Sequence, residues 1–486
     1  MVIANDTPDS PVSRVALVAC LLSVLALACG GGQSSDPFGG PARPIAGDAP
    51  APDAPRAPEA EPEPVTIPDS PAGERLAQVL GWVEVPPSPD DLATVAAAFD
   101  ETVLELLPPT QLGLTLVQLS STLAGAELIE VAEPQAESPA IVAVLQPNEG
   151  IAWRVFITIE PEPAHRITGL LFRPAPDREL EAPETWDELD ALARDLAADA
   201  SWQAAEIVDG GCVPAASGSP GDVLPIGSTF KLYVLEAVVD AIAGGTLSWD
   251  DTVAMTDASR SLPTGTLHTA EVGETWTVDE LAARMIANSD NTATDLLLAT
   301  VGREAVEAAV VRLGHADPDQ LRPFLATHEM FALKAHEAGD LREAWVEATV
   351  DERRAMVAGL DAPPLGGVLP WVGPRANYDI EWFASTTDLC RAMASLHARM
   401  GTPEGERLAD ILSANPGVAI DDTVWPWVGY KGGSEPGVLN LTWLLRRADD
   451  RIFFFSLTLA DPDVAFDDLT GVAIAAHGLA LLESIP

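Results

Sequence analysis

The sequence predicts an α+β protein, in which a small α+β domain precedes a larger one that builds its sheet from both of its ends. Apolar residues recur at helical spacing through much of the chain, which indicates amphipathic helices. Short apolar runs bounded by turn residues interrupt them, as is typical of strands. The 486 residues also exceed what one hydrophobic core usually supports, so we expect two folded domains.

The charge balance argues against some classes of partner. The formal net charge of −47 repels phosphate backbones and anionic lipid surfaces, so we expect no nucleic-acid partner. The acidic residues are expected to form a solvated surface. Arginine carries nearly all of the positive charge, because the only lysines in the sequence are Lys231, Lys334 and Lys431.

The N-terminal segment has the features of an export signal. Arg14 precedes an apolar run of 14 residues, 15–28, which is too short to span a bilayer but fits a signal-peptide core. The stretch that ends at Cys29 resembles a bacterial lipobox, which implies that residues 1–28 are removed and that Cys29 carries a lipid. We therefore expect a secreted lipoprotein of the cell envelope or periplasm, anchored to the membrane. A plain cleaved signal or a misassigned start codon is the alternative.

A linker leads into the smaller domain. Residues 29–71 are dominated by Pro, Ala, Gly and acidic residues without apolar periodicity, so we expect them to be disordered. The smaller domain is expected at 72–178. Its first helix, at 88–106, begins with a capping serine followed by proline, and a second helix is expected at 110–125. The strand-like runs that complete it are 140–146, 151–159 and 167–173.

The larger domain is expected to span residues 183–486. A helix at 186–198 and a strand at 202–208 open it, and a long, mostly helical stretch follows. Near the C-terminus the sequence predicts a hairpin and a last helix, at 438–445, 451–459 and 467–483. Strands at both ends of a helical middle predict one sheet built from the termini of the domain.

Two cysteines, Cys212 and Cys390, lie in the larger domain. In an oxidising compartment they are able to form a disulfide. A pair of buried free thiols is the alternative, because the sequence does not give the distance between them.

The first chemical motif is Ser228-Thr229-Phe230-Lys231, at the start of a predicted helix. A serine at a helix N-terminus sits where the helix dipole favours developing negative charge, and a lysine three residues later lies on the same face. Partial burial beside a second cation is expected to depress the pKa of Lys231, so that Lys231 accepts the proton of Ser228.

Two further motifs follow. In Ser289-Asp290-Asn291, the serine is suited to pass a proton to a leaving group, and Asn291 to orient Lys231 or a substrate amide. Lys431-Gly432-Gly433-Ser434 is expected on an edge strand, where Lys431 adds positive potential. The glycines of this strand let a substrate approach the backbone.

In this order, the three motifs resemble those of class A β-lactamases and penicillin-binding proteins. The separation of 61 residues between Ser228 and Ser289 is similar to that of the family, and two of the three lysines stand at motif positions. The resemblance implies a β-lactamase/transpeptidase-like fold for the larger domain, without a metal or other cofactor. It also implies that the backbone amides of Ser228 and Ser434, beside Gly433, bind the oxyanion.

The two-domain order and the K-G-G-S motif further resemble the β-lactamase-like cephalosporin esterase of clavulanic acid biosynthesis. That resemblance implies a steroid-isomerase or NTF2-like fold for the smaller domain. It associates the larger domain with ester cleavage.

The chain also departs from the class A pattern. From Ser289 to Lys431 there are 142 residues, more than in typical members, which implies a helical insertion around 323–375. No E-x-x-L-N stretch is present to activate the deacylating water. Glu329, 40 residues after Ser289, is the candidate deacylation base, with a surface carboxylate as the alternative interpretation.

We therefore expect a serine hydrolase that acts on an ester or β-lactam carbonyl through an acyl-enzyme at Ser228. One alternative is a true class A-like β-lactamase or a D-alanyl-D-alanine peptidase acting on a peptidoglycan-like peptide. Another is a non-catalytic envelope binding or sensor protein. Lys334 lies outside every motif and is expected to be an exposed charge with little kinetic effect.

Overall fold

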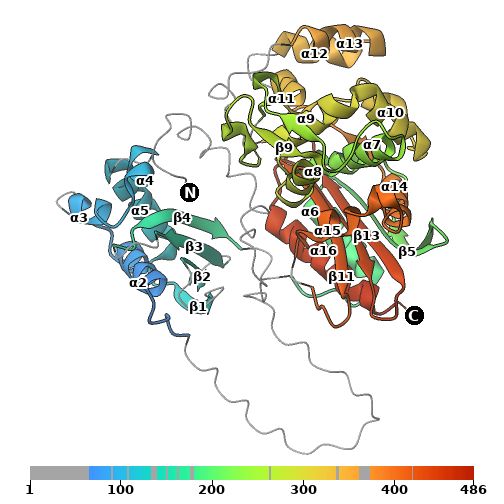
Figure 1. The fold of residues 1–486 in the computed structure, drawn as a ribbon. Helices are drawn as coiled ribbons and strands as arrows, with labels where there is room; N and C mark the ends of the chain where they lie inside the picture. Colours follow the sequence, from blue (N-terminus) through green and yellow to red (C-terminus); the bar gives the residue numbers. More distant parts are fainter. Residues whose placement is uncertain are drawn as a thin grey trace, which may run out of the picture. The chain divides into compact units, whose positions relative to one another are not determined.

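The computed structural model describes two compact units (Figure 1). The described part of the first unit ends at residue 175, and that of the second unit begins at residue 180. Cys29, the expected signal segment and most of the expected linker lie outside the described residues. Within the described residues, no helix combines the length and apolar character needed to cross a membrane. The described ranges are 65–88, 91–106, 109–132, 139–148, 152–160, 164–175, 180–261, 264–334, 339–360, 373–418 and 420–485.

The first unit is an α+β domain of helices followed by an antiparallel meander in the order β1-β2-β3-β4. Helix α2 contacts α5 and the strands β2 and β3, and apolar residues of these elements, such as Leu76, Leu116, Ile141 and Val155, are buried. The helices are α2 (Pro71–Glu84), α3 (Leu92–Ala96), α4 (Glu101–Leu106) and α5 (Pro109–Leu123). The strands are β1 (Glu127–Ala132), β2 (Ala140–Gln146), β3 (Trp153–Ile159) and β4 (Ile167–Pro174).

Three features of this unit differ from the sequence-based expectation. The single helix expected at 88–106 is two short helices, because Phe99 leaves the helix to form a β-bridge with Ile167. Helix α2 begins at the end of the expected linker, where Ser70 caps it by accepting a hydrogen bond from the Gly73 amide at 3.0 Å. Strand β1 adds a fourth strand to the three that were expected.

The second unit contains a five-stranded antiparallel sheet in the order β11-β12-β13-β5-β6. Its strands come from both ends of the unit, as the sequence predicted, and β11 lies at an edge. The expected closing hairpin is confirmed as β12 and β13. The strands are β5 (Asp199–Val208), β6 (Gly211–Gly218), β11 (Trp427–Glu435), β12 (Val438–Arg446) and β13 (Ile452–Ala460).

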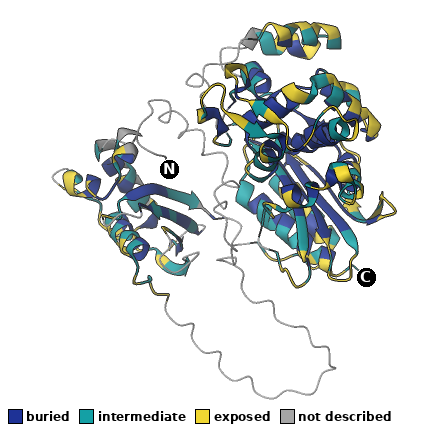
Figure 2. Ribbon diagram, in the orientation of Figure 1, coloured by how far each residue is buried: buried dark blue, intermediate teal, exposed yellow. Residues whose placement is uncertain are grey.

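Alternating side chains along these strands supply two separate cores, one on each face of the sheet. On β13, Phe453 and Phe455 belong to one core, and Phe454 between them belongs to the other. Figure 2 shows the buried strands running through the middle of the unit. Helices α6 (Trp186–Leu196) and α16 (Asp468–Glu483) pack on the face that carries Phe453 and Phe455.

The opposite face carries the helical middle of the unit. Helices α11, α12 and α13 lie in the segment where a helical insertion was expected. Two short strand pairs, β7 (Leu224–Pro225) with β10 (Phe383–Ala384) and β8 (Thr252–Ala254) with β9 (Thr275–Thr277), connect parts of it. The helices of this region are α7 (Lys231–Ala243), α8 (Val278–Ala287), α9 (Asn291–Val301), α10 (Arg303–Arg312), α11 (Thr327–Lys334), α12 (Gly339–Glu347), α13 (Val350–Ala358), α14 (Thr386–Arg399) and α15 (Leu408–Ser413).

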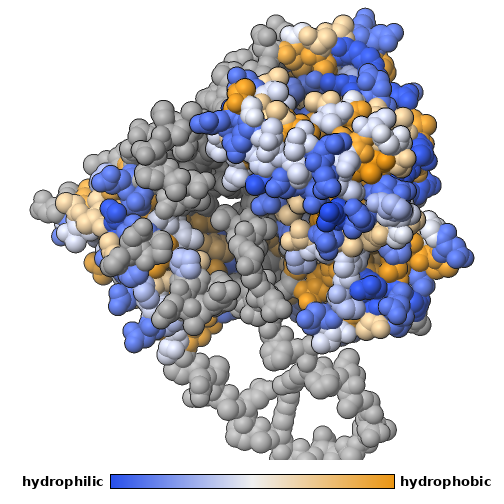
Figure 3. Space-filling model, in the orientation of Figure 1, coloured by the Kyte–Doolittle hydropathy of each residue, from blue (hydrophilic) through white to orange (hydrophobic). Residues whose placement is uncertain are grey.

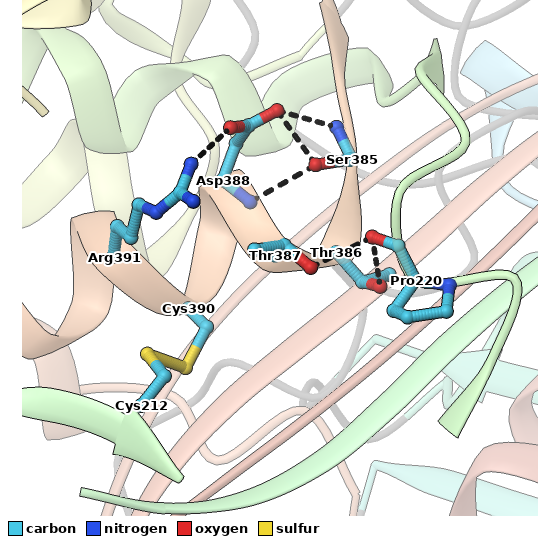
Figure 4. The surroundings of a disulfide bond; sticks show 8 residues. All are labelled: Cys212, Pro220, Ser385, Thr386, Thr387, Asp388, Cys390 and Arg391. Atoms are coloured by element: carbon cyan, nitrogen blue, oxygen red, sulfur yellow. Dashed lines mark hydrogen bonds and ion pairs between the residues drawn. A yellow bond between two sulfur atoms is a disulfide. The ribbon is translucent and has the colours of Figure 1, made fainter. Parts of the chain in front are cut away.

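A disulfide joins Cys212 of β6 to Cys390 of α14 across 178 residues of chain (Figure 4). Of the two outcomes that the sequence left open, the structure contains the bonded pair. Close by, the N-terminus of α14 is fixed by a capping box between Ser385 and Asp388. Arg391, one turn further along, donates a hydrogen bond to Asp388 at 3.1 Å. The edge strand β6 is therefore tied to the helix that covers the sheet.

Candidate active site

Ser228 lies where the short strand β7 ends and a helix begins. A single turn of 3₁₀-helix, η4 (Gly227–Phe230), carries it directly into α7. Glycines on both sides of this junction allow η4 and strand β11 to approach each other very closely. A Cβ on Gly227, whose φ is +50°, would lie 2.9 Å from the Ser434 amide nitrogen, and one on Gly433 would lie 2.3 Å from that of Ser228. The two expected oxyanion donors therefore stand on segments that only glycine brings this close.

Lys231 is fully buried at the start of α7. Its Nζ donates hydrogen bonds to the Ser289 carbonyl at 2.6 Å, to Ser289 Oγ at 3.0 Å and to Asn291 Oδ1 at 2.7 Å. Burial lowers the pKa of Lys231 to about 7, although Asp290 and Asp295 act in the opposite direction. A substantial fraction of this lysine is therefore neutral at physiological pH.

Ser289 is held in a strained backbone conformation between α8 and α9. Its φ of +52° lies in the left-handed region that a non-glycine residue rarely adopts. The Ser289 carbonyl accepts hydrogen bonds from Lys231 Nζ and, at 2.6 Å, from Thr264 Oγ1. These bonds hold the backbone in a conformation that presents Ser289 Oγ to the lysines.

Lys431 approaches the same hydroxyl from the sheet edge. Its Nζ donates to Ser289 Oγ at 3.0 Å, so that Ser289 accepts hydrogen bonds from both lysines. Burial, together with the nearby charge of Lys231, places the pKa of Lys431 well below its usual range. Two buried ammonium groups around one hydroxyl repel each other, which favours the loss of a proton from one of them.

Asp290 organises the loop beneath the site. One carboxylate oxygen caps α9 by accepting from the Ala293 amide, and the other accepts from the amides of Thr266 and Leu267, each at 2.9 Å. A Cβ on Gly265 would lie 2.1 Å from the Asp290 carboxyl carbon, so a larger residue there would displace this carboxylate. The segment 264–267 is thereby fixed against the start of α9.

A cavity opens above these groups. Ser228, Ser289, Lys431, Gly433 and Ser434 line it, so most of the residues singled out from the sequence meet there. Lys231 and Asn291 are not among the described lining residues, and Lys231 is connected to the cavity through its hydrogen bonds to Ser289. Thr264, Asn415 and Tyr430 also line the cavity but had no expected role. Thr264 stands in the stretch Leu-Pro-Thr-Gly at 262–265, which is similar to a stretch of the class A enzymes upstream of S-D-N and could have pointed to it. The full lining within the described residues is Ser228, Thr264, Ile286, Ala287, Asn288, Ser289, Asn415, Tyr430, Lys431, Gly432, Gly433 and Ser434.

Glu329 is not among the residues that line this cavity. One of its carboxylate oxygens accepts a hydrogen bond from Arg303 at 2.7 Å, and the other accepts from the Ala326 amide at 2.8 Å. The side chain is buried, so it is not a surface carboxylate either. This carboxylate holds the start of α11 through the Ala326 amide and pairs with Arg303, and it does not line the cavity that contains Ser228.

The expectation that Lys334 is an exposed charge is wrong. Its side chain is fully buried at the end of α11, against the carboxylates of Glu381 and Glu435. All three lysines of the chain are therefore buried. The visible face of the second unit carries hydrophilic and hydrophobic residues side by side (Figure 3).

Of the comparisons with known proteins, the family models gave one match. Residues 185–359 match the family model Beta-lactamase2, the beta-lactamase enzyme family. The matched residues include Ser228, Lys231 and Ser289, which supports a serine hydrolase, whereas β11 with Lys431 lies beyond them. The comparison with curated proteins gave no match.

Three solved structures that are similar to the chain have TM-scores below 0.5. A beta-lactamase from Sphaerobacter thermophilus has 18% identity and a TM-score of 0.43, with 62% of this chain and 99% of that chain covered. The putative class A beta-lactamase PenP from Rhodopseudomonas palustris has 17% identity and a TM-score of 0.43, with 62% and 98% covered. An acyl-enzyme complex of a PBP-A mutant with penicillin G has 16% identity and a TM-score of 0.41, with 63% and 98% covered.

Proposed function

We propose that this protein cleaves an ester or β-lactam carbonyl through an acyl-enzyme at Ser228. The observation that carries the proposal is the position of Ser289 Oγ, 3.0 Å from Lys231 Nζ and 3.0 Å from Lys431 Nζ. This hydroxyl shares its cavity with Ser228, so a proton taken from the nucleophile has a short route toward a leaving group.

In the proposed acylation step, neutral Lys231 accepts the proton of Ser228 as the serine oxygen bonds to the carbonyl carbon. The carbonyl oxygen takes the negative charge and binds to the backbone amides of Ser228 and Ser434. Losing one such donor typically costs about 3 kcal/mol of transition-state stabilisation. Ser289 then gives its proton to the leaving oxygen or nitrogen as the scissile bond breaks, and Lys231 returns a proton to Ser289.

The lining of the cavity supports a substrate that carries a carboxylate. Lys431 is the only charged side chain among the described residues that line it, although the whole chain has a net charge of −47. A cavity without acidic residues in so acidic a protein favours an anionic ligand. Once Lys231 is the neutral amine, the charge of Lys431 is not cancelled by any lining carboxylate, and an anionic ligand further favours its protonated form. Carboxylated cephalosporin esters, β-lactams and peptides ending in D-alanine all meet this requirement.

We give Glu329 no part in deacylation, since Arg303 and the Ala326 amide occupy its carboxylate. Without a carboxylate lining the described cavity, hydrolysis of the acyl-enzyme is expected to be slower than its formation. The test is a burst experiment on the purified protein with an ester, a cephalosporin and a D-Ala-D-Ala peptide. A burst followed by steady turnover of the ester supports an esterase. Fast turnover of the lactam favours a β-lactamase, and the absence of any adduct at Ser228 contradicts the proposal.

For the first unit, we propose the steroid-isomerase or NTF2-like assignment and a role in positioning or shielding the active site, without catalysis. Its helices followed by a four-stranded sheet support this assignment. Its Glu160 and Arg166 form an ion pair at 2.9 Å, which is a structural use of charge. Turnover of any of the three substrates by residues 72–178 alone would contradict this role.

The lipid-anchored location is also proposed. The apolar run before Cys29 supports it, and the Cys212–Cys390 disulfide is of a kind that persists in oxidising compartments. Mass spectrometry of the mature protein is expected to find a diacylglyceryl group on an N-terminal Cys29. An unmodified mature chain that starts elsewhere would refute the anchor.

A further inference from the structure

Lys334 has an environment unlike that of the other two lysines. From the end of α11, its Nζ forms an ion pair with Glu435 and lies 3.6 Å from Glu381 Oε2. It also donates to Asn377 Oδ1 at 3.4 Å. We call Lys334, Glu381 and Glu435 the Lys334 cluster. Its lysine is fully buried, and the side chain of Glu381 is only 1% exposed.

Each carboxylate of the Lys334 cluster belongs to a segment that leads into the active site. Glu435 is the last residue of β11 and directly follows Ser434. Glu381 directly precedes Trp382, whose carbonyl accepts a hydrogen bond from the Ile226 amide at 2.9 Å. The Trp382 ring also stacks on Phe230, with 3.7 Å between the ring centroids. Trp382 therefore holds the chain on both sides of Ser228.

Asn377 extends the connection to the turn after β11. Its Nδ2 donates to the Pro436 carbonyl at 2.8 Å, while its Oδ1 accepts from Lys334. The end of β11 is thus held to Lys334 both through the Glu435 side chain and through the backbone that follows it.

We propose that Lys334 is a positioning residue: through Glu435 and Glu381 it fixes the distance between the backbone amides of Ser434 and Ser228, which bind the oxyanion. This inference rests on the proposed acyl-enzyme function. Lys334 contacts neither the cavity nor the nucleophile within the described residues, so it acts through the two chain segments. Oxyanion stabilisation depends steeply on donor position, because donors must lie about 2.7–3.1 Å from the oxygen.

The charges of the cluster support this role. Burial raises the pKa of Glu381 to about 8. The charge of Glu435 also raises this pKa, whereas the charge of Lys334 lowers it. At neutral pH the cluster then holds a protonated Glu381 beside a charge-balanced pair. Asp379 of the same segment shares a small cavity with Glu381. Above pH 8 the ionised Glu381 adds a negative charge behind the oxyanion donors, which is expected to slow acylation.

The test compares the wild type with the double variant Lys334→Met/Glu435→Gln in the full chain. The double variant removes both charges together, so no uncompensated charge stays buried. We expect it to fold with a native circular dichroism spectrum. With p-nitrophenyl acetate, its acylation rate constant should fall by about tenfold or more, while the dissociation constant of the non-covalent complex changes less than twofold.

Arg399→Met is the matched control. Arg399 lies 3.6 Å from Glu236, whose side chain is fully buried, and pairs with Asp240 at 2.6 Å, so the variant also disturbs an enclosed ion pair. Neither partner belongs to β7, β10 or β11. Both lie on α7 beyond its first turn, where Arg312 still pairs with them at 2.8 Å, so acylation should keep its wild-type rate. A third variant, Glu381→Gln, should remove the decline in acylation above pH 8.

The outcomes separate the two proposals. A folded double variant that acylates within twofold of the wild type would overturn the role of Lys334 and leave the proposed function standing. An equal loss in Arg399→Met would also overturn it, since general destabilisation would then explain the effect. A wild-type protein that forms no adduct at Ser228 by peptide mass mapping would overturn the proposed function, and the role of Lys334 with it.

Discussion

The two buried lysine groups of the second unit are equally enclosed but differ in their partners. Lys231 and Lys431 meet neutral acceptors, Ser289 Oγ among them, and burial lowers the pKa of both lysines. Lys334 instead meets two carboxylates, and there burial raises the pKa of Glu381. The same loss of hydration thus yields a neutral amine in one group and a neutral carboxylic acid in the other. The charge of the partners decides which group holds the proton.

The largest expected effect comes from removing the amine that becomes neutral. Lys231→Ala should lower the acylation rate by roughly 10³-fold or more, which is within the range for loss of a general base. Lys231→Arg should be equally inactive, since arginine stays protonated and cannot accept the serine proton. Acylation of the variants by a chromogenic ester measures this. Near-normal acylation by Lys231→Arg would remove the base role and leave Lys231 as a structural cation.

The second effect concerns the positive potential from β11. Lys431→Ala should slow acylation by about 10²-fold, and Lys431→Arg should recover part of this loss, because arginine still supplies positive charge. The contrast with Lys231→Arg is the informative result. If Lys431→Arg acylates as slowly as Lys231→Arg, then the shape of the lysine side chain matters more than its charge at both positions. The assignment of a base role to Lys231 and an electrostatic role to Lys431 would then be contradicted.

The third prediction uses pH to separate the groups. The folded-state pKa of Lys231 is lowered from 10.5 to about 7, so the folded protein binds fewer protons than the unfolded chain between these values. The contribution of Lys231 to the free energy of unfolding is therefore full above pH 10.5 and is lost as pH falls toward 7. For Glu381 the folded-state pKa is raised from 4.5 to about 8, so its contribution is full below pH 4.5 and lost as pH rises to 8.

Glu381→Gln removes the pH dependence of stability that comes from Glu381 and leaves that of Lys231 in place. Urea unfolding at pH 5 and pH 8 should therefore show that the variant gains a few kcal/mol relative to the wild type on going to the higher pH. Lys231→Met, measured at the same two values, should instead show a small relative loss at pH 8, since the wild type gains stability from Lys231 as pH rises above about 7. A relative stability of Glu381→Gln that does not change between the two pH values would contradict the raised pKa.

The difference between the lysine groups also marks what the sequence was able to predict. Ser228 and Lys231 lie within one helical turn, so their spacing alone predicted a shared face, and the later motifs carried the resemblance that joined them. The partners of Lys334 come from segments 47 and 101 residues further along, which no local pattern connects. Its burial was missed because an isolated lysine is usually exposed.

The fold divides in the same way. The hairpin of β12 and β13 consists of continuous apolar runs and was predicted, whereas β6 was not, since its residues are mostly exposed and lack alternation. Phe99 interrupts a helix with good apolar spacing because pairing with Ile167 competes with the local preference. In each case the missing information is a contact with a distant part of the chain.

The smallest expected effect on activity comes from the disulfide, which tests whether stability alone explains the lysine results. Neither Cys212 nor Cys390 contributes to a lysine group, yet their bond closes a long loop between β6 and α14. Cys212→Ser/Cys390→Ser should lower the free energy of unfolding by about 2–4 kcal/mol, chiefly because the unfolded chain is then less constrained. The loss should be the same at pH 5 and pH 8, and acylation at 25 °C should be unchanged. If the folded double variant acylates as slowly as Lys334→Met/Glu435→Gln, then the rate follows overall stability, and the positions of the two oxyanion donors do not depend on Lys334 in particular.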